Sequence, residues 1–518
     1  MSTSGKDKWW ILGVLCLSVL IIGMDNFILN IALPTLVRSL HASETQLQWM
    51  VDSYILIFAA LLLTMGSLGD RFGRRSSLQI GLAIFGVGSC LSAFAQSANM
   101  LIFARAAMGV GAAAILPSTL SILTNTFPYE ERARAIGIWA GVSAIGLATG
   151  PILGGWLLGH FPWGSVFLIN VPVVIFALIV GQLILPNSRD PEAPRLDIAG
   201  SGLSIIGLVS LVYGIIEAPT KGWGSGEIAA SFAVAAVGLS AFLIWELRCD
   251  HPMLNLRFFR NPSFSAANAT VTLTFFALSS ALFFLTQYFQ FVLGYSPLET
   301  GFRLLPMVAT MMVMAPISPR LAERFGNKPS VVGGMLVAAA ATFYFSRTTP
   351  ESGYPHAAIL LVVIAFGLFL AMVPATNSIM GSLPLGKAGV GSAMNDTTRQ
   401  VGGALGVAVL GSILTSVYRS QIQSALSALP PNALASAKNS VGAAIAVGNG
   451  VGGSPGDAIV AAAKASFIHG MDRGMEVGTI FIVASAIVAL LWLPNRVIQP
   501  AESKAEPPGL EDANAVRE

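Results

Sequence analysis

Long apolar segments dominate this sequence and limit what it can fold into. Fourteen runs of roughly 17 to 29 residues recur along the chain, each ended by glycine, proline or charged residues. A helix of about 20 apolar residues crosses the hydrocarbon core of a bilayer, and it satisfies its own backbone hydrogen bonds there. The sequence therefore predicts an all-α membrane protein with fourteen transmembrane helices, near residues 9–33, 47–69, 78–97, 101–124, 135–159, 165–185, 199–217, 228–247, 264–292, 301–319, 329–346, 357–383, 399–418 and 476–495.

Composition excludes several other classes of protein. Hydrophobic residues make up 54% of the chain and charged residues 11%, which no water-soluble domain of 518 residues would show. A net charge of +3 without a Lys/Arg block argues against a nucleic-acid partner. The three cysteines have no metal-ligand spacing, and no GxxxxGK[ST] loop is present. We therefore expect no metal, no cofactor and no use of ATP.

The distribution of basic residues predicts the orientation. With this span count, most of the 29 Lys and Arg residues fall in loops on the same side as the N-terminus. The positive-inside rule then places both termini in the cytoplasm and the chain in the cell (inner) membrane. The longest connection, residues 419–475, is expected outside as a loop with a short helical hairpin. Residues 499–518 are expected to form a polar, disordered cytoplasmic tail.

Three charged residues fall inside the apolar runs. From the helical rise, Asp25, Asp52 and Arg105 share roughly one depth, about 8 to 12 Å below the outer surface. A lone charge there costs several kcal/mol, so such groups pair or line a wet cavity. One arginine and two acids leave one negative charge, for which a proton and a cationic substrate can compete. Asp25 is the main candidate for proton coupling, with Asp52 and Asn30 supporting it.

Each of these residues also has a purely structural interpretation, which the sequence leaves open. Asp25 can accept a hydrogen bond from Asn30 or from backbone. Asp52 can be a charge near a helix N-terminus, where the helix dipole favours it. Arg105 can lock neighbouring spans together by donating to backbone carbonyls.

Two glycine-rich segments are candidate moving parts. A tight cytoplasmic turn between spans two and three has the sequence GSLGDRFGRR, with Gly66, Asp70, Arg71, Gly73, Arg74 and Arg75 as its candidate gate residues. The fifth span contains small residues at near-helical spacing and a proline, which allow close packing and bending: Gly146, Gly150, Pro151, Gly154 and Gly155. Ordinary loop charge and plain helix packing are the alternatives. Weaker candidates for a gate or rim are Glu217, Asp396 and Arg399.

The GSLGDRFGRR turn resembles a motif of the major facilitator superfamily. The same family is indicated by LIFARAAMGVGAA, similar to its fourth-span arginine motif, and by GLATGPILGG, similar to its fifth-span antiporter motif. Four further segments resemble motifs of the fourteen-span drug:proton antiporters, a group that includes quaternary-ammonium exporters. These segments are GMDNFILNIALP, WMVDSYILIFAA, FLINVP and AGVGSAMNDTTRQVGGALG. The resemblance covers about residues 9–497. It implies two six-helix bundles, residues 1–190 and 261–498, with two inserted helices within residues 191–260.

The second half departs from the family pattern. Its counterpart of the cytoplasmic turn, PRLAERFGNKPS, keeps only part of the motif. The predicted spans from Phe264 onward contain no Asp or Glu in their interiors. This argues against divalent cations as substrates and against more than one or two coupled protons.

Together these features predict a proton-coupled efflux antiporter working by alternating access. We expect a monomer that exports lipophilic, monovalent cations such as quaternary ammonium compounds and dyes in exchange for protons. The alternative is an exporter of a neutral or zwitterionic amphiphile, namely a lipid, an antibiotic or a metabolite. An enzyme is not expected, because all five histidines fall in predicted loops and no HExxH or GxSxG motif is present. A channel is disfavoured by the resemblance to antiporters.

Overall fold

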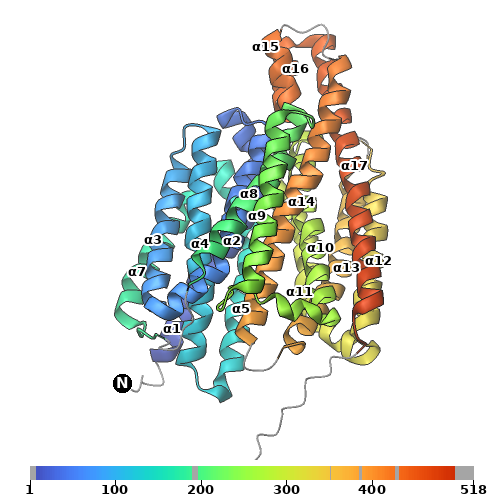
Figure 1. Cartoon of the computed structure of the whole chain (residues 1–518). Helices are drawn as coiled ribbons and strands as arrows, with labels where there is room; N and C mark the ends of the chain where they lie inside the picture. Colours follow the sequence, from blue (N-terminus) through green and yellow to red (C-terminus); the bar gives the residue numbers. More distant parts are fainter. Residues whose placement is uncertain (1–6, 190–195, 350–351, 384–387, 426–430, 496–518) are drawn as a thin grey trace, which may run out of the picture.

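The computed structural model of the chain describes residues 7–189, 196–349, 352–383, 388–425 and 431–495, and these residues form helices and connecting loops (Figure 1). The first half contains α1 (Asp7–Leu40), α2 (Glu44–Phe72), α3 (Arg74–Ala93), α4 (Ala98–Thr126), α5 (Tyr129–His160), α6 (Ser165–Leu168) and α7 (Asn170–Ile184). Two further helices follow, α8 (Ile198–Lys221) and α9 (Gly226–Arg248). The second half contains η1 (Leu256–Arg260), α10 (Pro262–Gln287), η2 (Tyr288–Val292), α11 (Pro297–Phe325), α12 (Asn327–Phe345), α13 (Tyr354–Gly381), α14 (Ala388–Ala425), α15 (Pro431–Asn439), α16 (Val441–Val451) and α17 (Gly453–Trp492).

The structure confirms the all-helical membrane fold. Among the described residues, thirteen segments are long and apolar enough to cross a membrane, with α6 and α7 together forming one of them. The helix α5 is not among these thirteen, although it has 32 residues and packs along α1. It contains the fifth predicted span, near residues 135–159.

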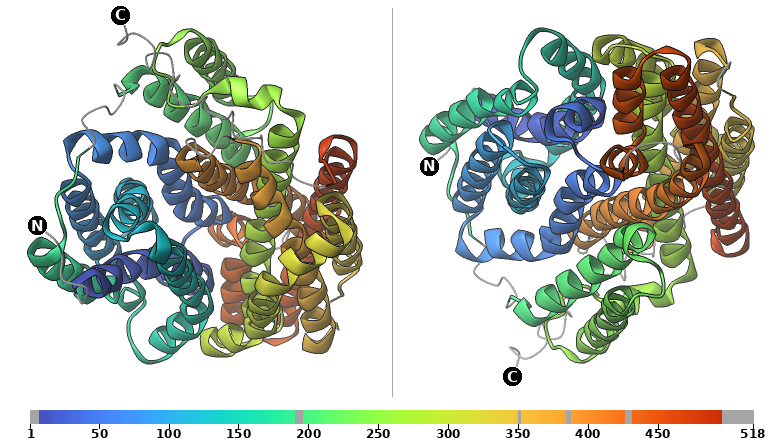
Figure 2. Two further views of the ribbon diagram at one scale, coloured as in Figure 1. Left: turned by 90° about the horizontal axis from the view of Figure 1, so that it is seen from below. Right: turned by 90° about the horizontal axis from the view of Figure 1, so that it is seen from above.

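The helices are arranged as two groups that repeat the same pairings (Figure 2). In the first group α1 packs on α5 and α2 on α4, and in the second α10 packs on α14 and α11 on α13. The pair α8 and α9 stands outside both groups, and α8 packs on α2 and on α14. The inserted helices therefore cover the seam where α2 and α14 meet.

Matched glycines allow the closest helix contacts in each half. A Cβ atom on Gly111 of α4 would lie 2.7 Å from the carbonyl oxygen of Gly81 in α3. A Cβ atom on Gly334 of α12 would likewise lie 2.5 Å from the carbonyl oxygen of Gly367 in α13. Since no side chain fits between these backbones, glycine is required at both crossings.

Two late helices begin earlier than the hydropathy predicts. The helix α14 begins at Ala388 rather than near residue 399, and α17 begins at Gly453 rather than near residue 476. Asp396 and Asp472 consequently lie within helices long enough to cross a membrane, outside the bounds predicted for these spans. Hydropathy underestimates such helices because their first turns are polar or rich in glycine and so lower the local mean hydropathy.

The long connection after α14 is largely helical. The helix α14 continues to Ala425, and α15 and α16 pack against each other at the end of the molecule remote from the N-terminus (Figure 1). The predicted tail, residues 499–518, lies outside the described residues.

Candidate transport site

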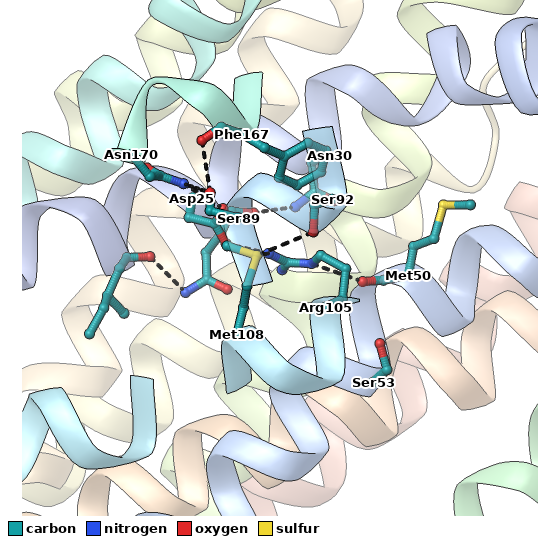
Figure 3. Close-up of polar contacts among 12 residues, drawn as sticks. Asp25, Asn30, Met50, Ser53, Ser89, Ser92, Arg105, Met108, Phe167 and Asn170 are labelled. Atoms are coloured by element: carbon teal, nitrogen blue, oxygen red, sulfur yellow. Dashed lines mark hydrogen bonds and ion pairs between the residues drawn. The ribbon is translucent and has the colours of Figure 1, made fainter. Parts of the chain in front are cut away.

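A buried ion pair and its hydrogen bonds join four helices of the first bundle, α1, α2, α4 and α7 (Figure 3). Arg105 of α4 donates from Nη1 to Oδ2 of Asp25 in α1, and both side chains are only 1% exposed. The Arg105 Nε atom also donates to the Met50 carbonyl oxygen at 3.2 Å, and the guanidinium lies 4.3 Å from the centre of the Tyr54 ring. A second donor, Asn170 Nδ2, lies 3.3 Å from Asp25 Oδ1. The carboxylate is therefore paired and hydrogen-bonded, as a buried charge requires.

Neighbouring contacts hold this pair in place. Asn170, the first residue of α7, also donates to Ser89 Oγ at 3.1 Å, and Ser89 donates to the Phe167 carbonyl oxygen at 2.8 Å. On α4, a Cβ atom at Gly109 would lie 2.6 Å from the Tyr54 carbonyl oxygen, so glycine lets α2 approach the arginine. Sequence reasoning missed the role of Asn170. The available signal was one amide residue within the apolar segment FLINVP.

The geometry resolves two of the open interpretations. Asp25 is not bonded to Asn30, whose Nδ2 instead donates to the Asn26 carbonyl oxygen at 2.9 Å. Arg105 both pairs with an acid and bonds a backbone carbonyl. The helix α1 continues to Leu40, so Asp25 lies near the midpoint of this helix.

A small cavity of about 120 Å³ lies between the two bundles. Its wall is built from α1, α2, α4, α10 and α14, and its polar and aromatic members are Asn26, Phe27, Asn30, Arg105, Phe275, Ser279, Arg399 and Gln400. Asp25 is not in this wall, whereas its partner Arg105 is, so the arginine stands between the carboxylate and the cavity. Ligand pockets usually measure about 300 to 1,000 Å³, so the bundles must separate before a drug-sized molecule fits.

Asp52 occupies a different place. It is 0% exposed, and within the described residues no hydrogen bond reaches either carboxylate oxygen. One turn earlier on α2, Gln48 donates to Thr415 of α14 at 3.1 Å and Trp49 donates to Glu217 of α8 at 3.0 Å. Residues three and four apart share a helix face, so Asp52 faces the junction of α2, α8 and α14. As the ninth residue of α2 it also lies beyond the first turn, where the helix dipole acts.

The GSLGDRFGRR turn between α2 and α3 is fixed within the first bundle. Asp70 pairs with Arg74 at 2.7 Å, and Arg75 donates to the Leu185 carbonyl oxygen at 3.3 Å. Gly73 has a φ of +123°, and a Cβ atom there would lie 2.8 Å from Asn187 Oδ1. The turn therefore ties α2 and α3 to the segment after α7. The other predicted gate residues lie beside it: Gly66 faces Pro117, and the Arg71 guanidinium lies over the Phe72 ring.

The glycines of α5 face two different helices. Gly146, Gly150 and Gly154 pack against α1, where Cβ atoms would lie 2.8 to 3.3 Å from atoms of α1 residues. Gly155 faces the other bundle instead, since its Cβ atom would lie 2.6 Å from Leu298 Cα in α11. In the same contact, a Cβ atom on Gly301 of α11 would clash with the carbonyl oxygen of Pro151. The motif thus combines packing within one bundle with contact between bundles.

Several contacts between the bundles lie at the end of the molecule remote from the N-terminus (Figure 1). Besides Gly155 with Leu298 and Gln48 with Thr415, Gln290 donates to the Ile31 carbonyl oxygen at 2.9 Å. These contacts hold the two bundles together at this end of the molecule in this conformation.

The weaker candidates are also placed. Arg399 lines the central cavity, lies 3.8 Å from Asp396 and sits over the Phe275 ring at 5.4 Å. Glu217 lies at the outer end of α8, where Lys221 Nζ is 3.9 Å away. Among the described residues, no group of three or more His, Cys, Asp or Glu side chains is placed to hold a metal ion.

Comparison with known proteins identifies the family. The sequence profile of the Major Facilitator Superfamily matches residues 15–407. The tetracenomycin C resistance and export protein of Streptomyces glaucescens is 35% identical, over 96% of this chain and 93% of its own length. The multidrug efflux pump LfrA of Mycolicibacterium smegmatis is 36% identical over 93% and 95%. The methyl viologen resistance protein SmvA of Salmonella typhimurium is 32% identical over 89% and 93%.

Solved structures show the same fold. An inward-facing, unoccupied bacterial homolog of the human lysosomal transporter Spinster has a TM-score of 0.68 at 18% identity, covering 94% of this chain and 97% of that one. The inward-open xylose transporter XylE of E. coli has a TM-score of 0.56 at 14% identity, covering 94% and 96%. The repeated bundles, the motifs and these matches agree. The chain belongs to the Major Facilitator Superfamily, a family of membrane transporters.

Proposed function

We propose that this protein exports lipophilic organic cations in exchange for protons, by alternating access between its two bundles. The observation that carries the proposal is the buried Asp25–Arg105 pair, whose arginine faces the cavity between the bundles. The names of the relatives support an efflux role, since one is a multidrug efflux pump and another a resistance and export protein. We place both termini in the cytoplasm and take the monomer as the working unit.

Proton coupling acts through Arg105. While Asp25 is ionised, the pair is neutral and a cation can occupy the cavity beside it. A proton on Asp25 leaves the arginine charge uncompensated. At separations of about 4 to 8 Å and an effective dielectric constant of about 20, that charge repels a monocation by about 2 to 4 kcal/mol. Proton and substrate then exclude each other, which an exchanger requires, although the substrate never touches the carboxylate.

The substrate range follows from the cavity wall. Phe27 and Phe275 offer aromatic faces, and Asn26 and Asn30 offer amide groups, which suit a flat lipophilic cation. The argument against dications is weaker than the sequence suggested, because Asp396 lies within a helix long enough to cross a membrane. A relative named for resistance to methyl viologen, an organic dication, favours including such compounds.

A second candidate function is export of a neutral or zwitterionic amphiphile. The observation that favours it is the presence of two arginines, Arg105 and Arg399, in a cavity wall whose described members include no acid. Such a wall offers donors to phosphate or carbonyl oxygens as readily as it offers rings to a cation.

Gradient-driven efflux from inverted vesicles tests the proposal. Ethidium transport under an imposed pH gradient is compared in the parent, in Asp25→Asn and in Asp457→Asn, which removes an exposed acid at the outer end of α17. The amide keeps the shape of the carboxyl group but cannot take up a proton. We expect Asp25→Asn alone to lose the response to the gradient. Unchanged efflux in Asp25→Asn would remove that residue from coupling. Gradient-driven export of a zwitterion but not of ethidium would establish the second candidate.

A further inference from the structure

A second, larger hollow lies on the outer side of the molecule. It measures about 720 Å³ and is built by the outer ends of α2, α4, α8 and α14. We call this hollow the outer vestibule, and its wall includes Trp49, Ile102, Tyr213, Glu217 and Thr415. Its volume falls within the range of small-molecule pockets, unlike that of the central cavity.

The outer vestibule contains a carboxylate, Glu217, whose ion pair with Lys221 is long at 3.9 Å. Glu217 accepts from Trp49 Nε1 at 3.0 Å and from Thr220 Oγ1 at 3.5 Å, and both are neutral donors. Lys221 Nζ lies 3.9 Å from Glu217 but 2.6 Å from Glu227 Oε1. The lysine charge is therefore engaged chiefly by Glu227. Glu217 is the only acid among the described residues of the vestibule wall.

Aromatic rings flank this carboxylate. The Trp49 and Tyr213 ring centres lie 6.1 Å apart, and both rings belong to the vestibule wall. The one arginine in the wall, Arg419, donates to Asn439 Oδ1 at 3.2 Å. Lys221 Nζ lies 5.0 Å from the centre of the Tyr213 ring, so among the described residues Trp49 offers the ring that has no cation over it. A carboxylate beside an electron-rich ring is the arrangement that attracts an organic cation.

The vestibule also lies next to the buried Asp52. Trp49 precedes Asp52 by three residues, which is about 4.5 Å along the helix axis. The residue whose indole is bonded to Glu217 therefore lies about one turn from a buried acid with no hydrogen-bond partner among the described residues. Both acids lie on the seam that the inserted helix α8 covers.

We propose that the outer vestibule is an exit-side binding site for a lipophilic organic monocation. Glu217 is the charge partner, Trp49 and Tyr213 form the aromatic walls, and the site receives the cation after it leaves the region of Asp52. The charge class of the ligand rests on the proposed function. The site itself is separate from the central cavity and is contributed in part by α8.

Protection of an introduced thiol tests this site. Thr220→Cys is made in a chain whose three cysteines are replaced by serine, and right-side-out vesicles are labelled with a membrane-impermeant maleimide. Ethidium at about four times its dissociation constant slows labelling about fivefold if it occupies the vestibule. We expect Glu217→Gln to remove this protection and Asp457→Asn to retain it. Absence of protection in the parent, or equal protection with Glu217→Gln, overturns the proposal.

Two further experiments distinguish the alternatives, one for the charge class of the ligand and one for the proposed function. An alkyl trimethylammonium ion is compared with a zwitterion of the same chain length, and better protection by the zwitterion overturns the assignment to a monocation. Gradient-driven ethidium efflux is measured with the same variants. Efflux without protection refutes the vestibule site and leaves the proposed function standing. Protection without gradient-driven efflux supports the site and refutes the proposed function.

Discussion

The contact of Gly155 with α11 gives a quantitative prediction about the conformational equilibrium. A Cβ atom on Gly155 would lie 2.6 Å from both Leu298 Cα and the Pro297 carbonyl oxygen. Both atoms belong to backbone and cannot rotate away, so Gly155→Ala overpacks this crossing at a cost of about 1 to 3 kcal/mol. The contact lies at the outer ends of α5 and α11, and opening the outer side relieves it. We therefore expect the substitution to favour the outward-open state by about 5- to 150-fold.

Thiol labelling measures this shift. Ser279→Cys places a thiol in the wall of the central cavity, and a membrane-impermeant maleimide reaches it from outside only when the bundles open outward. The matched control is Gly154→Ala, whose Cβ atom would meet a side-chain atom of Ile28 at 3.3 Å within the same bundle. Labelling should accelerate with Gly155→Ala and stay near the parent rate with Gly154→Ala. Equal rates in the two variants would refute the idea that this contact controls outer opening.

Three further substitutions test other parts of the structure. Asn170→Ala removes a donor from a buried carboxylate and from a buried hydroxyl, so we expect a loss of about 1 to 3 kcal/mol, seen as a lower Tm in detergent. Gly73→Ala forces a side chain into a backbone conformation with φ +123° and should cost about 1 to 3 kcal/mol, whereas Gly66→Ala meets Pro117 Cβ at an ordinary 3.5 Å and should leave Tm unchanged. Arg399→Gln leaves Asp396 without its ion pair, so efflux of a dication relative to a monocation should rise, and an unchanged ratio would exclude Asp396 from substrate recognition.

Helical rise and hydropathy allowed much of this fold to be predicted. Apolar length determines where a membrane helix crosses, because lipid leaves few alternatives for the backbone. Counting residues from the helix ends placed Asp25 and Arg105 at a common depth, and the structure joins them directly. Depth was predictable because each residue adds a fixed 1.5 Å along the axis.

The direction in which a residue faces could not be predicted in the same way. Asp52 shares the depth of Arg105, yet it faces α8 and α14 on another side of α2. That assignment requires knowing which helices flank α2, and the sequence around Asp52 does not contain this information. Hydropathy missed the early start of α14 for a related reason. A hydropathy scale that assumes lipid on every side of a helix assigns the polar first turns of α14 to a loop.

Separating Asp52 from Arg105 changes where the surplus negative charge lies. Arg105 neutralises Asp25 beside the central cavity, and so the unpaired carboxylate belongs to the seam beneath the outer vestibule. An ionised carboxylate buried there without a partner costs several kcal/mol, so Asp52 needs either a proton or a passing cation. The central cavity, by contrast, has a wall whose described residues include rings, amides and two arginines but no acid. Such a wall imposes few directional requirements on a ligand and selects by shape. We propose that Asp52 and Glu217 add recognition of the substrate charge on its outward route, beyond the discrimination that the Asp25–Arg105 pair provides at the central cavity.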